Sequence, residues 1–331
     1  MSADDGEVSV ADYLAEWLER RRSRLSPTTH QSYRQTIACY LTPHLGHLAP
    51  GQIDRRLLEG LYAHLLTGGG TDGRPLSPST VKYVHAVISR ALEDARIDGL
   101  IATNPARLAR PPRHDPRQVT LAEELKVWTP EEAARFLAFV DDHRWRALFH
   151  LALGTGARRG ELLGLRWQDV DLDAAQVRIR RALSVVDGVT RLLATKTARV
   201  RCLSVGGSVV EALRRHREEQ ERLRAAADRW DNEWGLVFTD ASGRPIDPKR
   251  VTDEFRTLVR RAPVPVVRFH DLRHAHATIL VAEGVPLKVV SERLGHTHIA
   301  ISMDIYGHVL PAMDADAAAR FEAALDRGSA G

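Results

Sequence analysis

The sequence predicts a mainly α-helical protein with one small antiparallel β-sheet, arranged as two domains. The chain has 331 residues, which is more than one typical hydrophobic core needs and enough for two. Apolar residues recur at helical spacing through residues 9–109 and again in the last third of the chain. Between residues 176 and 205 the spacing changes to that of strands, so we expect the sheet to lie in the second domain.

Composition indicates a protein of the cytoplasm. Lys plus Arg number 47 against 43 for Asp plus Glu, so the formal charge of +4 is weak for a protein that coats DNA generally, and the basic groups must act locally. Nearly all of them are Arg, which suits forked contacts to phosphate, although a biased genome composition explains the same excess. Cys39 and Cys202 have no CxxC or metal-type spacing, which favours a reducing compartment. The acidic start is no signal peptide, and no run approaches about 18 apolar residues, so we expect no membrane contact.

Residues 9–109 are expected to form the first domain, made of packed helices. Two helices should begin at Ser26 and Ser77, each followed by proline, because a serine N-cap with proline at the first helical position satisfies the free N–H groups of a helix start. A glycine-rich loop over 67–76 separates two helical pairs. The segment ADYLAEWLERR has one apolar face, which consists of Tyr13, Leu14, Trp17 and Leu18.

A segment rich in proline and arginine, NPARLARPPRHDPRQ, indicates the domain boundary, since it has no periodicity and four prolines. The second domain should open with a capping box, in which Thr129 is the N-cap and Glu132 the third helical residue. The predicted divisions are a short tail over 1–8, the first domain over 9–109, a linker over 110–127, the second domain over 128–310 and a tail helix over 311–331.

Three runs of strand-like sequence, VRIRRALSVV, VTRLLAT and ARVRCLSV, predict a three-stranded antiparallel sheet. Asp187-Gly188 between the first two runs is a strong hairpin signal, and Lys196 lies in or beside the second turn. The other elements expected are a charged helix over 208–229, a short strand over 236–239, a helix capped by Asp247, and helices that stop at Gly284 and Gly295.

The second domain holds residues suited to cutting a phosphodiester through a covalent intermediate. This chemistry needs a nucleophile, cations on the non-bridging oxygens and an acid for the leaving oxygen. Arg158 and Arg273 are candidates for the cations, because a guanidinium keeps its proton and forks onto phosphate. Lys196 at a hairpin tip can donate the proton, and Tyr306 offers a phenol as nucleophile.

Two histidines extend this set. His270 precedes Arg273 by three residues, so the two share a face if the segment is helical. His296, after Gly295, supplies another donor that titrates near neutral pH.

The order Arg, Lys, His-x-x-Arg, His, Tyr, with LGH before the tyrosine and Gly-His after it, resembles the catalytic domain of the tyrosine recombinases, the phage-integrase family, and the resemblance covers nearly the whole chain. It implies a helical SAM-like core-binding domain followed by an α+β catalytic domain. It also implies a 3′-phosphotyrosine intermediate, a free 5′-hydroxyl, and neither metal nor other cofactor. Glu161, in the TGxRxxE pattern, resembles the family's acid that steadies the site without reacting.

The resemblance implies an integrase of a prophage or other mobile element that acts as a homotetramer on double-stranded DNA, with a host bending protein or an excisionase as further partners. Only eight residues precede Ser9, so we expect no additional domain for arm-type sites. The tail after Tyr306 can form an apolar helical face, which docks either on a neighbouring protomer or on its own domain.

Other functions remain to be weighed. Within the same class stand a transposon integrase and an Xer-like resolvase of chromosomes or plasmids. Outside it stand a non-catalytic DNA-binding regulator on the same fold and a metal-dependent nuclease. No carboxylate stands at HExxH-like spacing and no cysteine is near, so we predict no metal at the histidines that could hold one, His270, His274, His276, His296 and His298.

Overall fold

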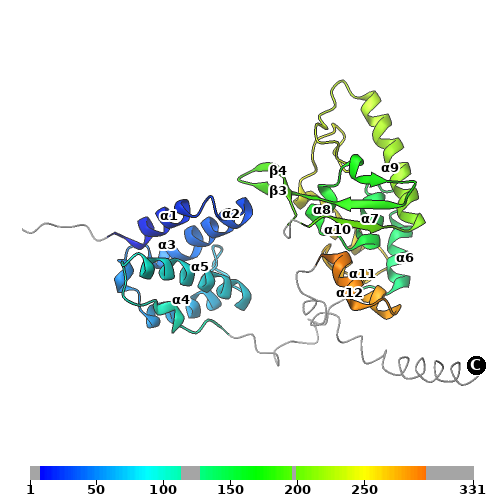
Figure 1. Cartoon of the computed structure of the whole chain (residues 1–331). Helices are drawn as coiled ribbons and strands as arrows, with labels where there is room; N and C mark the ends of the chain where they lie inside the picture. Colours follow the sequence, from blue (N-terminus) through cyan, green and yellow to red (C-terminus); the bar gives the residue numbers. More distant parts are fainter. Residues whose placement is uncertain (1–7, 113–126, 196–198, 296–331) are drawn as a thin grey trace, which may run out of the picture. The chain divides into compact units, whose positions relative to one another are not determined.

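The structure is a computed structural model of the chain, and it describes residues 8–112, 127–195 and 199–295 (Figure 1). The chain divides into two compact units, Met1–Glu124 and Leu125–Gly331. Among the described residues, no helix combines the length and the apolar character that a membrane span requires. Three predicted site residues, Lys196, His296 and Tyr306, lie outside the described residues, as do the predicted tail helix and most of the predicted linker.

The first unit is helical throughout its described part, as predicted. Its two expected serine caps are confirmed, because the Ser26 and Ser77 hydroxyls each accept a hydrogen bond from a backbone N–H three residues on, at 3.2 Å. A π-helical turn follows the second helix directly, with helical backbone angles on both sides of it. The elements are α1 (Val10–Arg20), α2 (Pro27–Thr36), η1 (Ile37–Leu41), α3 (Thr42–Leu45), η2 (Pro50–Gln52), α4 (Arg55–Thr67), α5 (Pro78–Ile97) and η3 (Pro105–Arg107).

The predicted apolar face of α1 is buried, and polar contacts at its ends join it to α5. The Tyr13 hydroxyl donates to the Ala91 carbonyl at 2.7 Å. The Trp17 indole donates to the Asp94 carboxylate at 2.6 Å, and Arg21 pairs with the same carboxylate. These partners satisfy the polar atoms that the buried aromatic rings bring with them.

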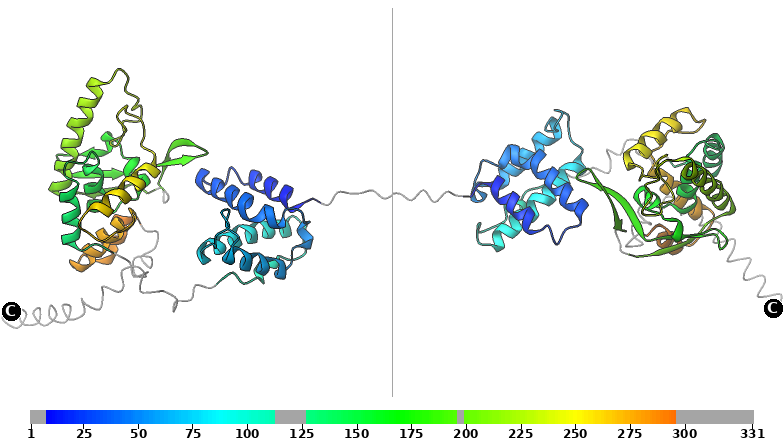
Figure 2. Two further views of the ribbon diagram at one scale, coloured as in Figure 1. Left: turned by 180° about the vertical axis from the view of Figure 1, so that it is seen from behind. Right: turned by 90° about the horizontal axis from the view of Figure 1, so that it is seen from above.

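The second unit combines helices with small antiparallel sheets. Figures 1 and 2 show α11 and α12 at one end of this unit and the outer part of α9 at the opposite end. The predicted capping box at Thr129 and the predicted cap at Asp247 are both confirmed. The elements are α6 (Pro130–Phe139), α7 (Arg146–Thr155), α8 (Arg159–Leu163), η6 (Trp167–Asp169), β1 (Val170–Asp171), β2 (Gln176–Ile179), β3 (Arg181–Val186), β4 (Val189–Ala194), β5 (Arg201–Ser204), α9 (Gly207–Ala226), α10 (Pro248–Arg261), α11 (Asp271–Ala282) and α12 (Leu287–Leu294).

A cluster of four aromatic rings forms the centre of this unit's core. Trp128, Phe136, Phe149 and Phe255 are each almost fully buried and contact one another with ring centroids 4.8–6.1 Å apart. Their tilted and edge-on arrangements are those that aromatic pairs favour. Helix α7 carries Phe149 and also packs against α9 and α11, so the core fixes the helix that leads into the candidate site.

The predicted pairing of the first two strand-like runs is confirmed, but the predicted single sheet and the place of the third run in it are wrong. The first run forms two strands, and β5 pairs with β2 instead of β4, while β1 extends that sheet to three strands. Strands β3 and β4 form a separate two-stranded hairpin. The run breaks at Arg180, whose guanidinium pairs with the buried Asp169 carboxylate at 3.2 Å. Since Val177 and Ile179 face the core, an unbroken alternation would turn Arg181 inward, and the break leaves that charge exposed.

The hairpin turn itself is confirmed. Asp187 and Gly188 have φ angles of 53° and 75°, which is the left-handed pair that a two-residue I′ turn requires. In Figure 2 the hairpin extends beyond the helices of its unit. The predicted strand over 236–239 is wrong, because residues 236 and 239 make only isolated bridges, to Arg166 and Pro245.

Candidate active site

The C-terminal end of α12 holds three arginines that come from three different elements, and we call them the arginine cluster. Arg201 donates to the carbonyl of residue 293 at 2.9 Å, Arg273 to that of residue 294 at 2.7 Å and Arg158 to that of residue 295 at 3.4 Å. The last carbonyls of a helix lack partners within it and carry the negative end of its dipole. The end of α12 therefore gathers guanidinium groups at one place.

Arg158 stands directly before α8 and is locked to the first turn of that helix. Its backbone N–H donates to one Glu161 oxygen at 2.9 Å, and its guanidinium donates to the other at 3.0 Å. The side chain of Arg158 is about one-third exposed, at 32%. It is thus held on one side by protein and open to solvent on the other.

Glu161 is buried and paired with two arginines. Besides Arg158, it accepts a hydrogen bond from Arg201, whose guanidinium is also buried. Burial alone would raise the pKa of the Glu161 carboxyl, but the charges of Arg201 and Arg158 and the backbone N–H outweigh it and hold the pKa below its usual value. Glu161 therefore stays ionised at neutral pH and anchors both guanidinium groups.

Arg273 on α11 is 4% exposed and is fixed by main-chain carbonyls of two other helices. It donates to the Gly156 carbonyl at 2.7 Å, in addition to its bond to the end of α12. Gly156 caps α7 with a φ of 61°, and a Cβ there would lie 2.7 Å from Leu294 and 2.8 Å from His276. Only glycine fits this junction of α7, α11 and α12.

His270 stands at the start of α11, close enough to both arginines to feel their charge. Partial burial lowers the pKa of its imidazole, and the charges of Arg273 and Arg158 lower it further against the opposing charge of Asp271. The ring contacts that of His274 edge-on, with centroids 5.3 Å apart. At neutral pH His270 is therefore a neutral group that can donate one hydrogen bond.

The structure thus brings together four predicted residues, Arg158, Glu161, His270 and Arg273. It also adds Arg201, which the sequence reasoning missed. The signal was present, because in ARVRCLSV the alternation of a strand puts Arg201 on the same face as the buried Leu203. An arginine on the inward face of a strand calls for a buried partner, and Glu161 is that partner.

Of the histidines weighed as metal ligands, His270, His274 and His276 have other contacts, while His296 and His298 lie outside the described residues. The Nδ1 of His276 lies within hydrogen-bond distance of the Leu153 carbonyl, at 2.7 Å. Within residues 8–112, 127–195 and 199–295, no three His, Cys, Asp or Glu side chains are grouped so that they could hold a metal ion.

The buried His276 is expected to make the fold less stable at acid pH. Burial, followed by the charge of Arg293, lowers its pKa from 6.5 to about 4. A histidine with a lowered pKa stabilises the fold fully above pH 6.5, and this stabilisation is lost as the pH falls from 6.5 towards 4. The loss should be on the order of 3 kcal/mol, at about 1.4 kcal/mol for each pH unit. Urea unfolding at pH 7.5 and pH 4.5 measures it.

His276→Gln should remove the His276 share of the pH dependence of the free energy of unfolding, because glutamine cannot be protonated in this range, while the other histidines with lowered pKa values keep theirs. His143→Gln, in the same unit, is the matched control and should keep the His276 share. Equal slopes in His276→Gln and the unchanged chain would contradict the assignment.

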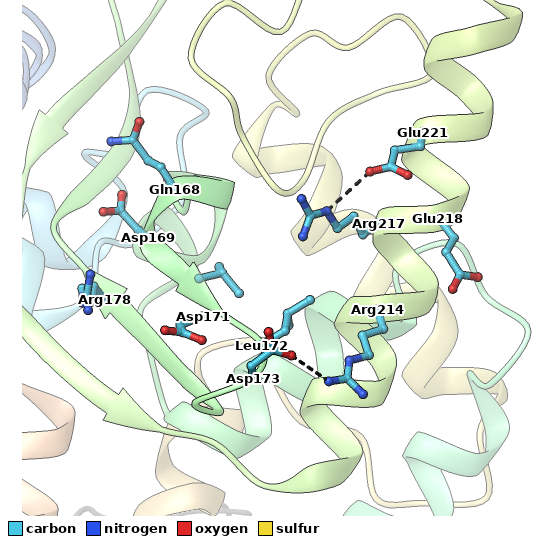
Figure 3. A pocket seen from close by; sticks show the side chains of 11 residues that line it. Gln168, Asp169, Asp171, Leu172, Asp173, Arg178, Arg214, Arg217, Glu218 and Glu221 are labelled. Carbon is cyan, nitrogen blue, oxygen red and sulfur yellow. Dashed lines mark hydrogen bonds and ion pairs between the residues drawn. The ribbon is translucent and has the colours of Figure 1, made fainter.

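A cavity of about 530 Å³ lies elsewhere in the second unit, between β1, β2 and α9, and contains none of the predicted site residues. Figure 3 shows Arg214 paired with Asp173 and Arg217 paired with Glu221 across and along its wall. Carboxylates outnumber guanidinium groups there, so it is not a phosphate site. The charged residues of its lining are Asp169, Asp171, Asp173, Glu218, Glu221, Arg178, Arg214 and Arg217.

Comparisons with known proteins agree with this geometry. The model of the phage integrase family matches residues 126–313, and that of the phage integrase SAM-like domain matches residues 9–110. A XerC-like tyrosine recombinase of Caldanaerobacter subterraneus subsp. tengcongensis is 30% identical over 327 residues, which cover 94% of this chain and 82% of the relative. The ICEBs1 integrase of Bacillus subtilis is 23% identical over 313 residues, covering 92% of this chain and 80% of the relative.

The fold is shared with solved structures of integrases on DNA. The Tn1549 transposon integrase in complex with transposon right end DNA has a TM-score of 0.77 at 20% identity, covering 96% of this chain and 99% of that one. A lambda integrase tetramer bound to a Holliday junction has a TM-score of 0.64 at 17% identity, covering 91% of this chain and 78% of that one. The family model matches more than half of the length of this chain. The chain therefore belongs to the phage integrase family, the tyrosine recombinases.

Proposed function

We propose that this protein is a site-specific DNA recombinase, the integrase of a prophage or another mobile element, that cuts and rejoins DNA strands through a phosphotyrosine at Tyr306. The observation that carries the proposal is the arginine cluster at the end of α12, with the neutral His270 beside it. Guanidinium groups held by the protein before substrate arrives can stabilise the charge of a phosphoryl transition state without reorganising.

The distribution of tyrosines supports Tyr306 as the nucleophile. The chain has six tyrosines, and Tyr306 is the only one after Tyr83. The others belong to the first unit, where burial raises the pKa of Tyr13 and of Tyr62 and so keeps those phenols protonated. The second unit therefore has one phenol to offer.

Each residue then has a role in one balanced reaction. The Tyr306 oxygen attacks phosphorus and gives up its phenolic proton to the neutral imidazole of His270, the bond to the 5′-oxygen breaks, and a 3′-phosphotyrosine forms. Arg158 and Arg273 bind the non-bridging oxygens, with His270 and His296 as further hydrogen-bond donors. Lys196 gives a proton to the leaving 5′-oxygen, and the reverse reaction rejoins the strands. Glu161 keeps the arginines in place, and no metal or other cofactor takes part.

The proposed partner is double-stranded DNA, with the helical region over 9–109 as core-binding domain and the region over 128–310 as catalytic domain. A homotetramer would act on two sites, as the lambda integrase tetramer sits on a Holliday junction. A host bending protein or an excisionase would set the direction of the reaction. The protein would work in the cytoplasm, where its DNA is found.

A trapping experiment tests the proposal. The purified protein is incubated in EDTA with nicked duplexes that carry the element's end junctions, and the products are separated on a denaturing gel. A slower, protease-sensitive band with a free 5′-hydroxyl on the released strand is expected, and peptide mass spectrometry should place the nucleotide on Tyr306.

Two other results would each overturn the proposal. Tight binding to the duplex without any adduct would favour a non-catalytic regulator. Cutting that requires a divalent metal and leaves no adduct would identify a nuclease.

A further inference from the structure

We propose that Arg201 is a positioning residue, which holds the Glu161 carboxylate and the end of α12 in the arrangement that lets Arg158 and Arg273 act on phosphate. The inference rests on the proposed function. Arg201 itself is 8% exposed, so its effect on the reaction passes through these two partners.

The two ends of the Arg201 guanidinium bind different parts of the site. Nη2 donates to the Glu161 carboxylate, and Nη1 donates to the carbonyl of residue 293 at 2.9 Å. Because Glu161 also binds both the backbone N–H and the guanidinium of Arg158, one side chain on β5 connects the start of α8 to the end of α12. Both helices contribute to the arginine cluster.

Gly295 shows how closely Arg201 is fitted. This residue has a φ of 66°, and a Cβ built on it would lie 2.8 Å from the Arg201 Nη1 and 3.0 Å from Cδ and Cζ. The guanidinium thus packs directly on the main chain whose carbonyl accepts the bond from Arg158. A shift of Arg201 would move that acceptor, and errors of about 1 Å in a catalytic arrangement can cost roughly 100-fold in rate.

The charge of Arg201 also sets the ionisation of Glu161. Burial pushes the carboxyl towards its neutral form, and Arg201 is the first of the groups that oppose it. Without Arg201 the pKa of Glu161 should rise, so the carboxylate would be protonated at a higher pH and release Arg158. A purely structural residue would not create such a new pH dependence.

The test measures adduct formation in a single turnover with saturating nicked duplex, from pH 5.5 to pH 8. Arg201→Gln should lower the rate by about 10- to 100-fold and should lose further activity towards acid pH, while the Kd for duplex stays within about twofold. Arg201→Lys should recover only part of the rate. Lysine keeps the positive charge, but its single ammonium can reach only one of the two acceptors at a time in that geometry. Urea unfolding of each variant shows whether a lower rate comes from a folding defect or from displaced side chains in a folded protein.

Two further variants make the test specific. Arg178→Gln, on the neighbouring strand β2 with an exposed side chain, is the matched control and should behave like the unchanged chain. In Glu161→Gln with Arg201→Gln, the additional loss at acid pH should disappear, because the titrating carboxyl is gone. If Arg201→Gln fails to fold, Arg201→Lys carries the test, because lysine keeps the charge but can reach only one of the two acceptors at a time. A lower rate with an unchanged Kd would then support the positioning role, and an unchanged rate would overturn it.

An undiminished rate in Arg201→Gln, or a lower rate with the pH profile of the unchanged chain, would overturn the positioning role and leave the proposed function intact. The absence of an adduct with the unchanged chain would instead overturn the proposed function. The two failures are therefore distinguishable in one experiment.

Discussion

Tyr306→Phe is expected to abolish the covalent adduct while the affinity for duplex DNA stays within about twofold. The phenol oxygen is the atom that bonds to phosphorus, and phenylalanine lacks it. The rate should fall by at least ~10⁴-fold, since enzymes typically accelerate reactions by ~10⁶-fold or more. Denaturing gels after incubation with nicked duplex measure the adduct, and titration of labelled duplex measures the affinity.

Tyr83→Phe is the matched control for this experiment. Tyr83 lies on α5 in the first unit with 41% of its surface exposed, so losing its hydroxyl should change neither folding nor the adduct. An adduct that persists in Tyr306→Phe would show that another group attacks the phosphate, and mass spectrometry of that adduct would identify it.

Arg273→Ala should lower the rate of adduct formation by about 10² to 10³, the usual cost of removing one charge-stabilising donor from a transition state. The same change leaves the buried carbonyls of residues 156 and 294 without the donors they have in this structure. Each such loss costs about 1–3 kcal/mol, so the free energy of unfolding should fall as well. Single-turnover rates at saturating DNA and urea unfolding are the two measurements.

Arg273→Lys separates charge from geometry. Lysine keeps the charge but not the planar fork that reaches two carbonyls and a phosphate, so most of the rate should stay lost. Arg256→Ala, which removes an exposed guanidinium paired with Asp253 on α10, should leave rate and stability unchanged. Recovery of the full rate in Arg273→Lys would show that Arg273 acts only through its positive charge and that its planar fork is not needed.

Helix boundaries were the most predictable part of this fold because their signals are local. Ser26, Ser77, Thr129 and Asp247 each accept a backbone N–H two or three residues away, so a short stretch of sequence contains both partners. The same holds for the turn at Asp187-Gly188, whose backbone angles follow from two residues.

Strand pairing was not predictable in the same way. β5 could pair with β4, its neighbour along the chain, or with β2 across the whole hairpin, and the runs themselves look alike. The break that divides the first run lies at Arg180, whose guanidinium pairs with the buried Asp169, and Asp169 lies in a segment that periodicity does not connect with the strands. This contact joins residues that no local pattern relates.

The residues of the candidate site were likewise predictable where their signal is a local sequence pattern. Arg158, Glu161, His270 and Arg273 stand in recognisable sequence patterns, and the structure brings them together. The inward position of Arg201 could be read from the alternation of β5, but its partners on α8 and α12 are far from it in sequence and could not be.

The arginine cluster also has a consequence for how this enzyme can diverge over evolutionary time. Its acceptors at residues 293–295 are main-chain carbonyls, which every amino acid provides. These contacts therefore make no demand on the side chains at the end of α12, while Gly295 cannot change, because any side chain there would strike Arg201. Selection on these contacts should fall on the arginines and on Gly295, whereas the side chains of α12 are constrained by packing, as the fully buried Leu294 shows.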